Sequence, residues 1–129
     1  RAFGLPLGVA YQLRDDLLGV FGDPAVTGKP AGDDLTEGKR TVLIALARNK
    51  LPTAARNLVD ELLGDPSLDS QQIDVIRTAL RECGAVDEVE GIIDHNVQLA
   101  QAALAHAPIA ESARHELLKL ANAATTRTA

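Results

Sequence analysis

Apolar residues recur every three or four positions along most of the chain, which is the spacing of one face of an α-helix. The core has to be built from Leu, Ile, Val and Ala, because aromatic residues make up only 2% of the sequence and Met and Trp are absent. A β-sandwich draws on aromatic and β-branched residues, whereas this set of side chains suits packed helices. At 129 residues the chain has about the size of one domain, so the sequence predicts one all-α domain.

Six helices are predicted from these apolar stripes and from the glycine and proline residues that end them. The first covers residues 5–21 and ends before the sequence Gly22-Asp23-Pro24. The second covers residues 41–48, and its uninterrupted apolar run over residues 42–47 predicts cover on every side. The apolar stripe of the first helix consists of Val9, Leu13, Leu17 and Val20. Each of the other four helices is predicted from one further stripe, and the third of the six helices carries Leu51, Ala55, Leu58 and Leu62. The fourth carries Ile73, Ile76 and Leu80 with Asp69 or Ser70 as its cap, the fifth Val86, Val89, Ile93, Val97, Ala100 and Leu104, and the sixth Ala113, Leu117, Leu120, Ala121 and Ala124.

Charge and composition exclude several classes of protein. The formal net charge is −5, from 13 Lys and Arg against 18 Asp and Glu, so we expect no nucleic-acid partner. No run of about 18 apolar residues is present, so no transmembrane segment is predicted. The single cysteine, Cys83, excludes an internal disulfide and indicates a reducing compartment, so we expect a cytoplasmic protein. Its helical spacing from Ile76 and Leu80 predicts a small core residue rather than a reactive thiol.

Residues 11–40 hold most of the groups that can carry chemistry. Six of the 18 acidic residues lie in this stretch, together with four basic residues. Residues 23–40 show no apolar period, and a structureless stretch of this length inside a compact domain is usually functional. The segment from Gly22 to Lys29 is not a nucleotide-binding P-loop, because five residues rather than four separate its first glycine from Gly28, and Pro30 follows the lysine.

The first predicted helix carries a polar face that contains Gln12, Asp15 and Gly19, since residues three or four positions apart lie on one side of a helix. Asp16 is rotated by about 100° from Asp15, so the two carboxylates point at different places. Such a polar face is typical of any surface helix, but here lysines follow in the adjoining loop. Carboxylates combined with lysines suit a phosphate group bridged by Mg²⁺, which binds one or two carboxylates and completes its shell with water and phosphate oxygens.

Four stretches between Tyr11 and Thr41 stand in an order that is found in one enzyme family. They are Tyr11-Gln12-Leu13-Arg14-Asp15-Asp16-Leu17-Leu18-Gly19, Phe21-Gly22-Asp23, Thr27-Gly28-Lys29-Pro30-Ala31-Gly32-Asp33-Asp34-Leu35 and Glu37-Gly38-Lys39-Arg40-Thr41. Together they resemble the second aspartate-rich region of the trans-isoprenyl diphosphate synthases, or polyprenyl synthetases, and most of all that of geranylgeranyl diphosphate synthases. The resemblance implies the C-terminal part of an isoprenoid-synthase helical bundle, with the aspartate-rich helix and a diphosphate loop in residues 1–40 and C-terminal helices in residues 41–129.

The resemblance also implies an activity. Members of the family are Mg²⁺-dependent prenyltransferases that condense an allylic diphosphate with isopentenyl diphosphate into a longer polyprenyl diphosphate, commonly as homodimers. Asp15 resembles the acid that binds Mg²⁺ directly, and Asp16 resembles its supporting or water-mediated neighbour. Lys29 and Lys39 resemble the two lysines that clamp the allylic diphosphate, so both are predicted substrate-binding and catalytic residues.

Four further residues take a role from the resemblance. Gln12 matches the family glutamine beside the reacting carbons, so it is a predicted catalytic and substrate-binding residue. Tyr11 stands where the family usually has Phe and is a predicted substrate-binding residue. Asp23 and Asp34 match acids that order the loop.

The sequence departs from the family in two ways. The family motif is usually Asp-Asp-x-x-Asp, and Gly19 stands at its last position, so a carboxylate one turn beyond Asp15 is missing and we expect a weaker metal site. The first aspartate-rich motif is absent and the chain begins at Arg1 without an initiator Met, so we expect a fragment that is inactive alone. Two alternatives remain: a diphosphate-binding regulatory subunit without turnover, which Gly19 favours, and a purely structural helical bundle.

Overall fold

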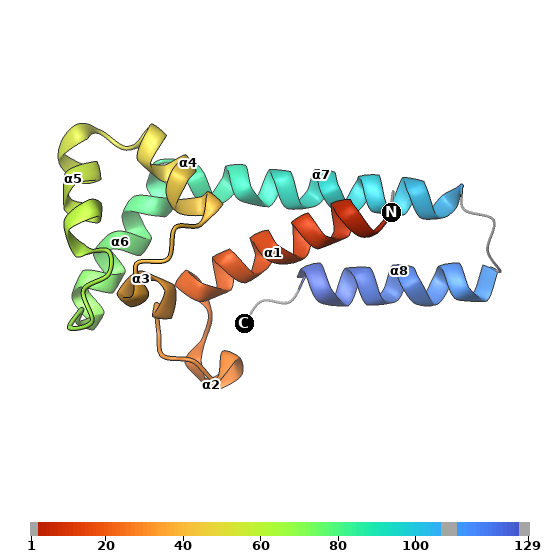
Figure 1. Ribbon diagram of the computed structural model, residues 1–129, viewed down its shortest axis with the longest axis horizontal. Helices are drawn as coiled ribbons and strands as arrows, with labels where there is room; N and C mark the ends of the chain where they lie inside the picture. Colours follow the sequence, from red (N-terminus) through yellow and green to blue (C-terminus); the bar gives the residue numbers. More distant parts are fainter. Residues whose placement is uncertain (1–2, 107–110, 127–129) are drawn as a thin grey trace.

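The structure is a computed structural model that describes residues 3–106 and 111–126. These ranges contain eight helices and no strand, which confirms the predicted all-α fold. The helices are α1 (Gly4–Phe21), α2 (Pro24–Thr27), α3 (Asp33–Glu37), α4 (Val42–Lys50), α5 (Thr53–Leu62), α6 (Ser70–Glu82), α7 (Ala85–Ala105) and α8 (Glu111–Thr126). Figure 1 shows α1, α7 and α8 lying alongside one another, with α3 to α6 gathered at one end of this layer. Over the described residues, no helix combines the length and the apolar character that crossing a membrane requires.

The contact between α1 and α7 is the most extensive helix pairing in the fold. Both helices bring their apolar stripes to it, and the guanidinium of Arg14 in α1 donates to both carboxylate oxygens of Glu90 in α7, each at 2.7 Å. One predicted member of the α1 stripe is wrong, because Val9 is 45% exposed and its neighbour Ala10 is completely buried. A small residue at the buried position lets neighbouring helices approach closely. The buried residues of the two stripes are Ala10, Leu13, Leu17 and Val20 in α1, and Ala85, Val89, Ile93, Ala100 and Leu104 in α7.

Side chains define where several helices begin. The hydroxyl of Thr41 accepts a hydrogen bond from the backbone N–H of Ile44 at 3.2 Å, so Thr41 caps α4 rather than forming its first residue. The carboxylate of Asp69 accepts from the N–H of Gln72 at 2.8 Å, and the Gln72 side chain accepts from the N–H of Asp69 at 3.0 Å. This capping box makes Asp69 the cap of α6, which decides between the two predicted candidates.

The described part of the chain covers the apolar run at residues 42–47 on one side only. Leu43, Ile44 and Ala47 are buried, whereas Val42 is 46% exposed. α4 packs against α7 and α1, which lie on one side of it. Within the described part of the chain, α4 is therefore a one-sided helix despite its uniformly apolar sequence.

Two other predicted stripes are wrong in part. In α5 the buried residue is Val59, which is 2% exposed, and its predicted neighbour Leu58 is 43% exposed. In α8 the predicted residues Leu120 and Ala113 are exposed, whereas Ala121, which was also predicted, is buried. Adjacent residues differ by about 100° around a helix, so where two apolar residues adjoin, the packing partner decides which of them is buried. The side chain of Ala124, also predicted for this stripe, lies outside the described residues.

The segment 23–40, predicted to lack regular structure, contains the short helices α2 and α3. The carboxylate of Asp23 accepts a hydrogen bond from the N–H of Ala25 at 2.9 Å and caps α2. Helices of four and five residues are too short to display an apolar period, which explains why the sequence pattern did not predict them. Figure 1 shows both helices close to the C-terminal end of α1.

Candidate functional site

A cavity of about 300 Å³ lies between the C-terminal half of α1 and the segment that carries α2 and α3. It brings together three of the predicted site residues, the carboxylate residue Asp15 and the two lysines Lys29 and Lys39. Because the lysines follow Asp15 by 14 and 24 positions, the fold of the loop is what assembles them. The full lining consists of Asp15, Leu18, Gly19, Val26, Thr27, Lys29, Pro30, Asp33, Asp34 and Lys39.

The other three predicted site residues do not line this cavity. Tyr11 and Gln12 lie one turn before Asp15 on α1, and both are exposed. Asp16 is 3% exposed, and one of its carboxylate oxygens accepts a hydrogen bond from the side-chain amide of Gln12 at 3.1 Å. Asp15 thus faces the cavity while Asp16 lies in the protein, as their relative rotation on the helix predicts.

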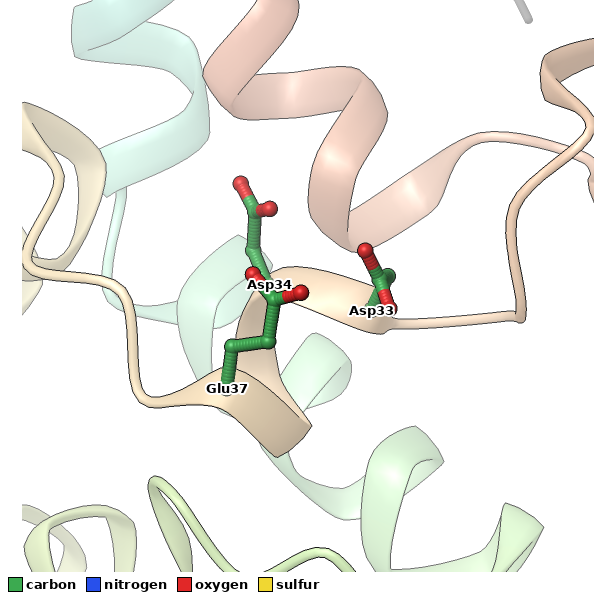
Figure 2. Close-up of side chains that lie close together, drawn as sticks. All are labelled: Asp33, Asp34 and Glu37. Atoms are coloured by element: carbon green, nitrogen blue, oxygen red, sulfur yellow. The ribbon is translucent and has the colours of Figure 1, made fainter.

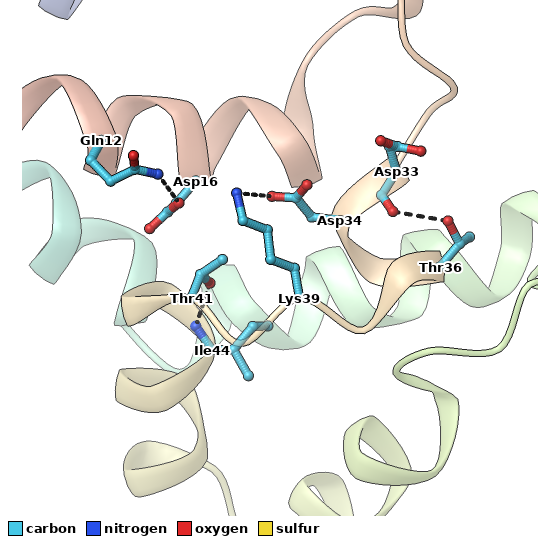
Figure 3. A network of polar contacts seen from close by, with 8 residues as sticks. All are labelled: Gln12, Asp16, Asp33, Asp34, Thr36, Lys39, Thr41 and Ile44. Atoms are coloured by element: carbon cyan, nitrogen blue, oxygen red, sulfur yellow. Dashed lines mark hydrogen bonds and ion pairs between the residues drawn. The ribbon is translucent and has the colours of Figure 1, made fainter.

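Lys39 forms an ion pair with Asp34 within the loop segment. Figure 3 shows its side chain reaching up between Asp16 and Asp34. Its Nζ lies 3.9 Å from a carboxylate oxygen of Asp34, whose side chain is 9% exposed, whereas the Lys39 side chain is 47% exposed. The ammonium is therefore held at one side by a buried carboxylate and remains accessible from the cavity.

Asp34 occupies the space that a side chain at residue 19 would need. A Cβ atom built on Gly19 would overlap Cγ and Oδ2 of Asp34 and would lie 2.8 Å from Oδ1. The Asp34 carboxylate from α3 therefore lies against α1 at the point where Gly19 has no side chain. The sequence analysis placed Asp34 among acids that order the loop. The sequence itself contains no signal that this acid folds back onto α1.

A second group of acids was not predicted. Oxygen atoms of Asp33, Asp34 and Glu37, all in α3, lie within 4.8 Å of one another (Figure 2). Carboxylate oxygens are the hard ligands that Mg²⁺ prefers, and a basic residue, Lys39, stands beside them. The donor chemistry of Asp15 and of this group therefore fits a divalent cation that is shared with a phosphate.

The turn between α5 and α6 contacts the loop segment at the C-terminal end of α3. The backbone N–H of Gly64 donates to the carbonyl of Leu35 at 2.9 Å, and a Cβ atom built on Gly38 would lie 2.9 Å from the Gly64 Cα. Gly38 also has a φ of +70°, a conformation that glycine adopts without strain. The two backbones thus meet without side chains between them, directly before Lys39.

Burial raises the pKa of the Asp34 carboxyl above its ordinary value of 3.8. The nearby charge of Lys39 opposes this shift, while Asp16 adds to it. The carboxyl of Asp34 therefore stays protonated to a higher pH in the folded chain than in the unfolded chain. The contribution of Asp34 to the free energy of unfolding is complete below the unfolded pKa and falls as the pH rises through the folded pKa.

We expect Asp34→Asn to remove this pH-dependent loss of stability. Without any ligand, the free energy of unfolding of the variant should exceed that of the unchanged chain above the folded pKa, because no charge is then buried at this position. Urea unfolding of both proteins from pH 3 to pH 8 measures the difference, in which the other carboxylates cancel. A constant difference across this range would show that Asp34 ionises with equal ease in both states.

Comparison with known proteins relates this chain to one enzyme family. The family model described as polyprenyl synthetase matches residues 1–82. The chain is 37% identical over 117 residues to a geranylfarnesyl diphosphate synthase of Aeropyrum pernix, covering 91% of this chain and 36% of that protein. It is 34% identical over 102 residues to a geranylgeranyl diphosphate synthase of Mycobacterium tuberculosis, covering 79% of this chain and 29% of that protein.

A solved structure has the same fold. The geranylgeranyl pyrophosphate synthase of Corynebacterium glutamicum, crystallised with isoprenyl diphosphate and magnesium, superposes with a TM-score of 0.93 at 43% identity, over 98% of this chain and 36% of that one. This chain therefore spans about a third of the length of the relatives it matches. The matched family model, which covers more than half of the chain, and the shared fold agree with the motifs in the first helix and its loop, and the chain belongs to the polyprenyl synthetase family.

Proposed function

We propose that this chain is part of a Mg²⁺-dependent prenyltransferase that joins an allylic diphosphate to isopentenyl diphosphate. The observation that carries the proposal is the cavity in which Asp15 faces Lys29 and Lys39. Two cations beside carboxylates suit a ligand that is anionic and brings a divalent metal with it. The relatives named for geranylfarnesyl and geranylgeranyl diphosphate synthesis, and the homologue crystallised with isoprenyl diphosphate and magnesium, support this class of substrate.

In the proposed site, Lys29 and Lys39 bind the diphosphate of the allylic substrate. Each charge-assisted contact is worth about 1.5–3 kcal/mol, and it strengthens as negative charge gathers on the leaving group. Asp15 holds Mg²⁺ directly, and Asp16 supports this side of α1 from within the protein. When bound, Mg²⁺ neutralises the phosphate oxygens and makes the diphosphate a better leaving group.

The proposed reaction breaks a C–O bond and a C–H bond and forms a C–C bond. The C–O bond of the allylic diphosphate breaks and leaves inorganic diphosphate and an allylic cation. The double bond of isopentenyl diphosphate then attacks this cation, a C–C bond forms, and a proton is lost to give the longer polyprenyl diphosphate. Gln12 and Tyr11 lie one turn from Asp15 on α1, so we place them beside the hydrocarbon portion of the substrate rather than at its diphosphate.

The remainder of the active site lies outside these residues in this proposal. The chain spans about a third of the length of its relatives, so we assign the binding of isopentenyl diphosphate to another part of a longer protein. We propose that this protein is a cytoplasmic homodimer without a nucleic-acid partner. The alternative is a diphosphate-binding subunit without turnover, which the missing acid at Gly19 favours.

Two measurements test the proposed function. The 129-residue chain should bind inorganic diphosphate in the presence of Mg²⁺ by titration calorimetry, and it should form no product from an allylic diphosphate and labelled isopentenyl diphosphate. The longer protein that contains the chain should form a polyprenyl diphosphate under the same conditions. Diphosphate binding by neither protein would contradict the proposed function, and product formed by the chain alone would contradict its partial character.

A further inference from the structure

A groove of about 260 Å³ lies between α1, the C-terminal end of α6 and the first turns of α7. Its apolar lining consists of Leu17, Leu18 and Phe21 from α1 and Val86 from α7. Leu17 belongs to the buried stripe of α1, whereas the other three side chains are half-buried, so part of their apolar surface faces the groove. We call this space the α1–α7 groove.

The α1–α7 groove is separate from the cavity that contains Asp15. Leu18 lines both spaces, but neither Asp15 nor the lysines Lys29 and Lys39 line the groove. The proposed function assigns no role to the residues of the groove, so an inference about the groove does not rest on that function.

Three charged side chains line the groove, and they leave an excess of one positive charge. Arg14 donates to both carboxylate oxygens of Glu90 at 2.7 Å, so the charges of this pair cancel. The guanidinium carbon of Arg81 lies 4.4 Å from the centre of the Phe21 ring, a contact that holds the cation at the groove without a counter-charge. Within the described residues, Arg81 donates no hydrogen bond and forms no ion pair, so its N–H groups have no acceptor from this chain.

We propose that the α1–α7 groove binds a small amphiphilic anion. The apolar chain of this ligand lies against Leu18, Phe21 and Val86, and its carboxylate or phosphate head accepts hydrogen bonds from Arg81. Burial of the chain removes apolar surface from water, and a guanidinium offers donors in a geometry that matches carboxylate and phosphate oxygens. The volume of the groove lies below the roughly 300–1,000 Å³ that is typical of drug-sized ligands, so the chain of the ligand is short.

Equilibrium dialysis of two labelled probes, octanoate and geranyl monophosphate, against the 129-residue chain tests this proposal. The measurement is made without Mg²⁺, and the probe that binds distinguishes a carboxylate head from a phosphate head. Arg81→Gln should weaken binding about threefold to tenfold, because a charge-assisted contact at an exposed side chain is lost. Val86→Phe should weaken it by about tenfold or more, since the larger side chain fills the groove. Binding of neither probe, or equal binding to Arg81→Gln and the unchanged chain, would overturn the proposal.

Controls of the same type lie outside the groove. Val75→Phe enlarges a valine on α6 that is 48% exposed, and Lys119→Gln removes a cation on α8 whose side chain is 64% exposed. Both variants should bind the probe as the unchanged chain does. Thermal unfolding shows whether Val86→Phe folds, and Arg81→Gln decides the proposal if it does not, because the exposed Arg81 side chain is not part of the core.

Two further results locate the bound probe. The Lys29→Ala, Lys39→Ala double variant should retain the binding, and its loss there would place the probe in the cavity that contains Asp15 and overturn the proposal. The longer protein that contains this chain should bind the same probe with the same dependence on Arg81. A probe that binds the 129-residue chain but not the longer protein would show that another segment fills the groove, and this result would also overturn the proposal.

Discussion

Replacing Lys29 or Lys39 with alanine should lower kcat/KM of the longer enzyme for the allylic diphosphate by about 10- to 100-fold each. Both lysines line the cavity that contains Asp15, and each would lose a charge-assisted contact to the diphosphate. The contact strengthens as the C–O bond breaks, so we expect kcat to fall as well as KM to rise. Steady-state kinetics at saturating isopentenyl diphosphate measure both parameters.

Lys119 provides a matched control for this pair. It lies on α8, its side chain is 64% exposed, and it pairs with Glu116 on the same helix, away from the cavity. Lys119→Ala should leave kcat/KM within about twofold of the unchanged enzyme, since an exposed pair of this kind contributes little. If the three alanine variants have equal kinetics, Lys29 and Lys39 do not bind the diphosphate.

Gly38→Ala should destabilise the fold by about 2–5 kcal/mol, which is the largest stability effect that we predict. The left-handed conformation at φ +70° accounts for about 1–2 kcal/mol of this cost. The remainder comes from overlap, since the new Cβ atom would lie 2.9 Å from the Cα and 3.1 Å from the nitrogen of Gly64. These are backbone atoms, so they cannot move aside as a flexible side chain does.

Gly84→Ala separates these two costs. Gly84 has a φ of +88°, but a Cβ atom there would meet no heavy atom within 4 Å. The control should therefore lose only the conformational part, and chemical unfolding of both variants gives the difference. Equal losses would mean that the backbones of Gly38 and Gly64 separate without cost, and the turn between α5 and α6 would then not position the loop.

Helical periodicity predicted the architecture but not every buried face. The stripe of α7 is correct at Val89, Ile93, Ala100 and Leu104, because one side of this long helix lies against α1. In α5 the pattern selected Leu58 instead of Val59, since two adjacent apolar residues leave the rotation of a short helix undetermined. The cap of α6 was predicted to within one residue, because the hydrogen bond of Asp69 is local in sequence.

The candidate site was predictable to the extent that it depends on local spacing. The motif on the first helix led to Asp15, and the rotation between Asp15 and Asp16 predicted that their carboxylates point at different places, as the cavity lining and the burial of Asp16 confirm. The place of Asp34 was not predictable, because a contact with Gly19 across 15 residues depends on how the intervening segment folds. That segment is shaped by two short helices and by the contact of Gly38 with Gly64, none of which has a periodic signature.

Two arginine contacts determine the roll of α1 about its own axis. Arg14, in the middle of α1, donates to both carboxylate oxygens of Glu90 on α7, and Arg77 on α6 donates to the backbone carbonyl of Val20, near the C-terminal end of α1, at 2.6 Å. A roll of one residue, about 100°, would turn Asp15 away from the cavity and bring Asp16 toward it. Because the two contacts come from residues 76 and 57 positions away along the chain, α6 and α7 set the angle at which α1 presents Asp15 to the cavity.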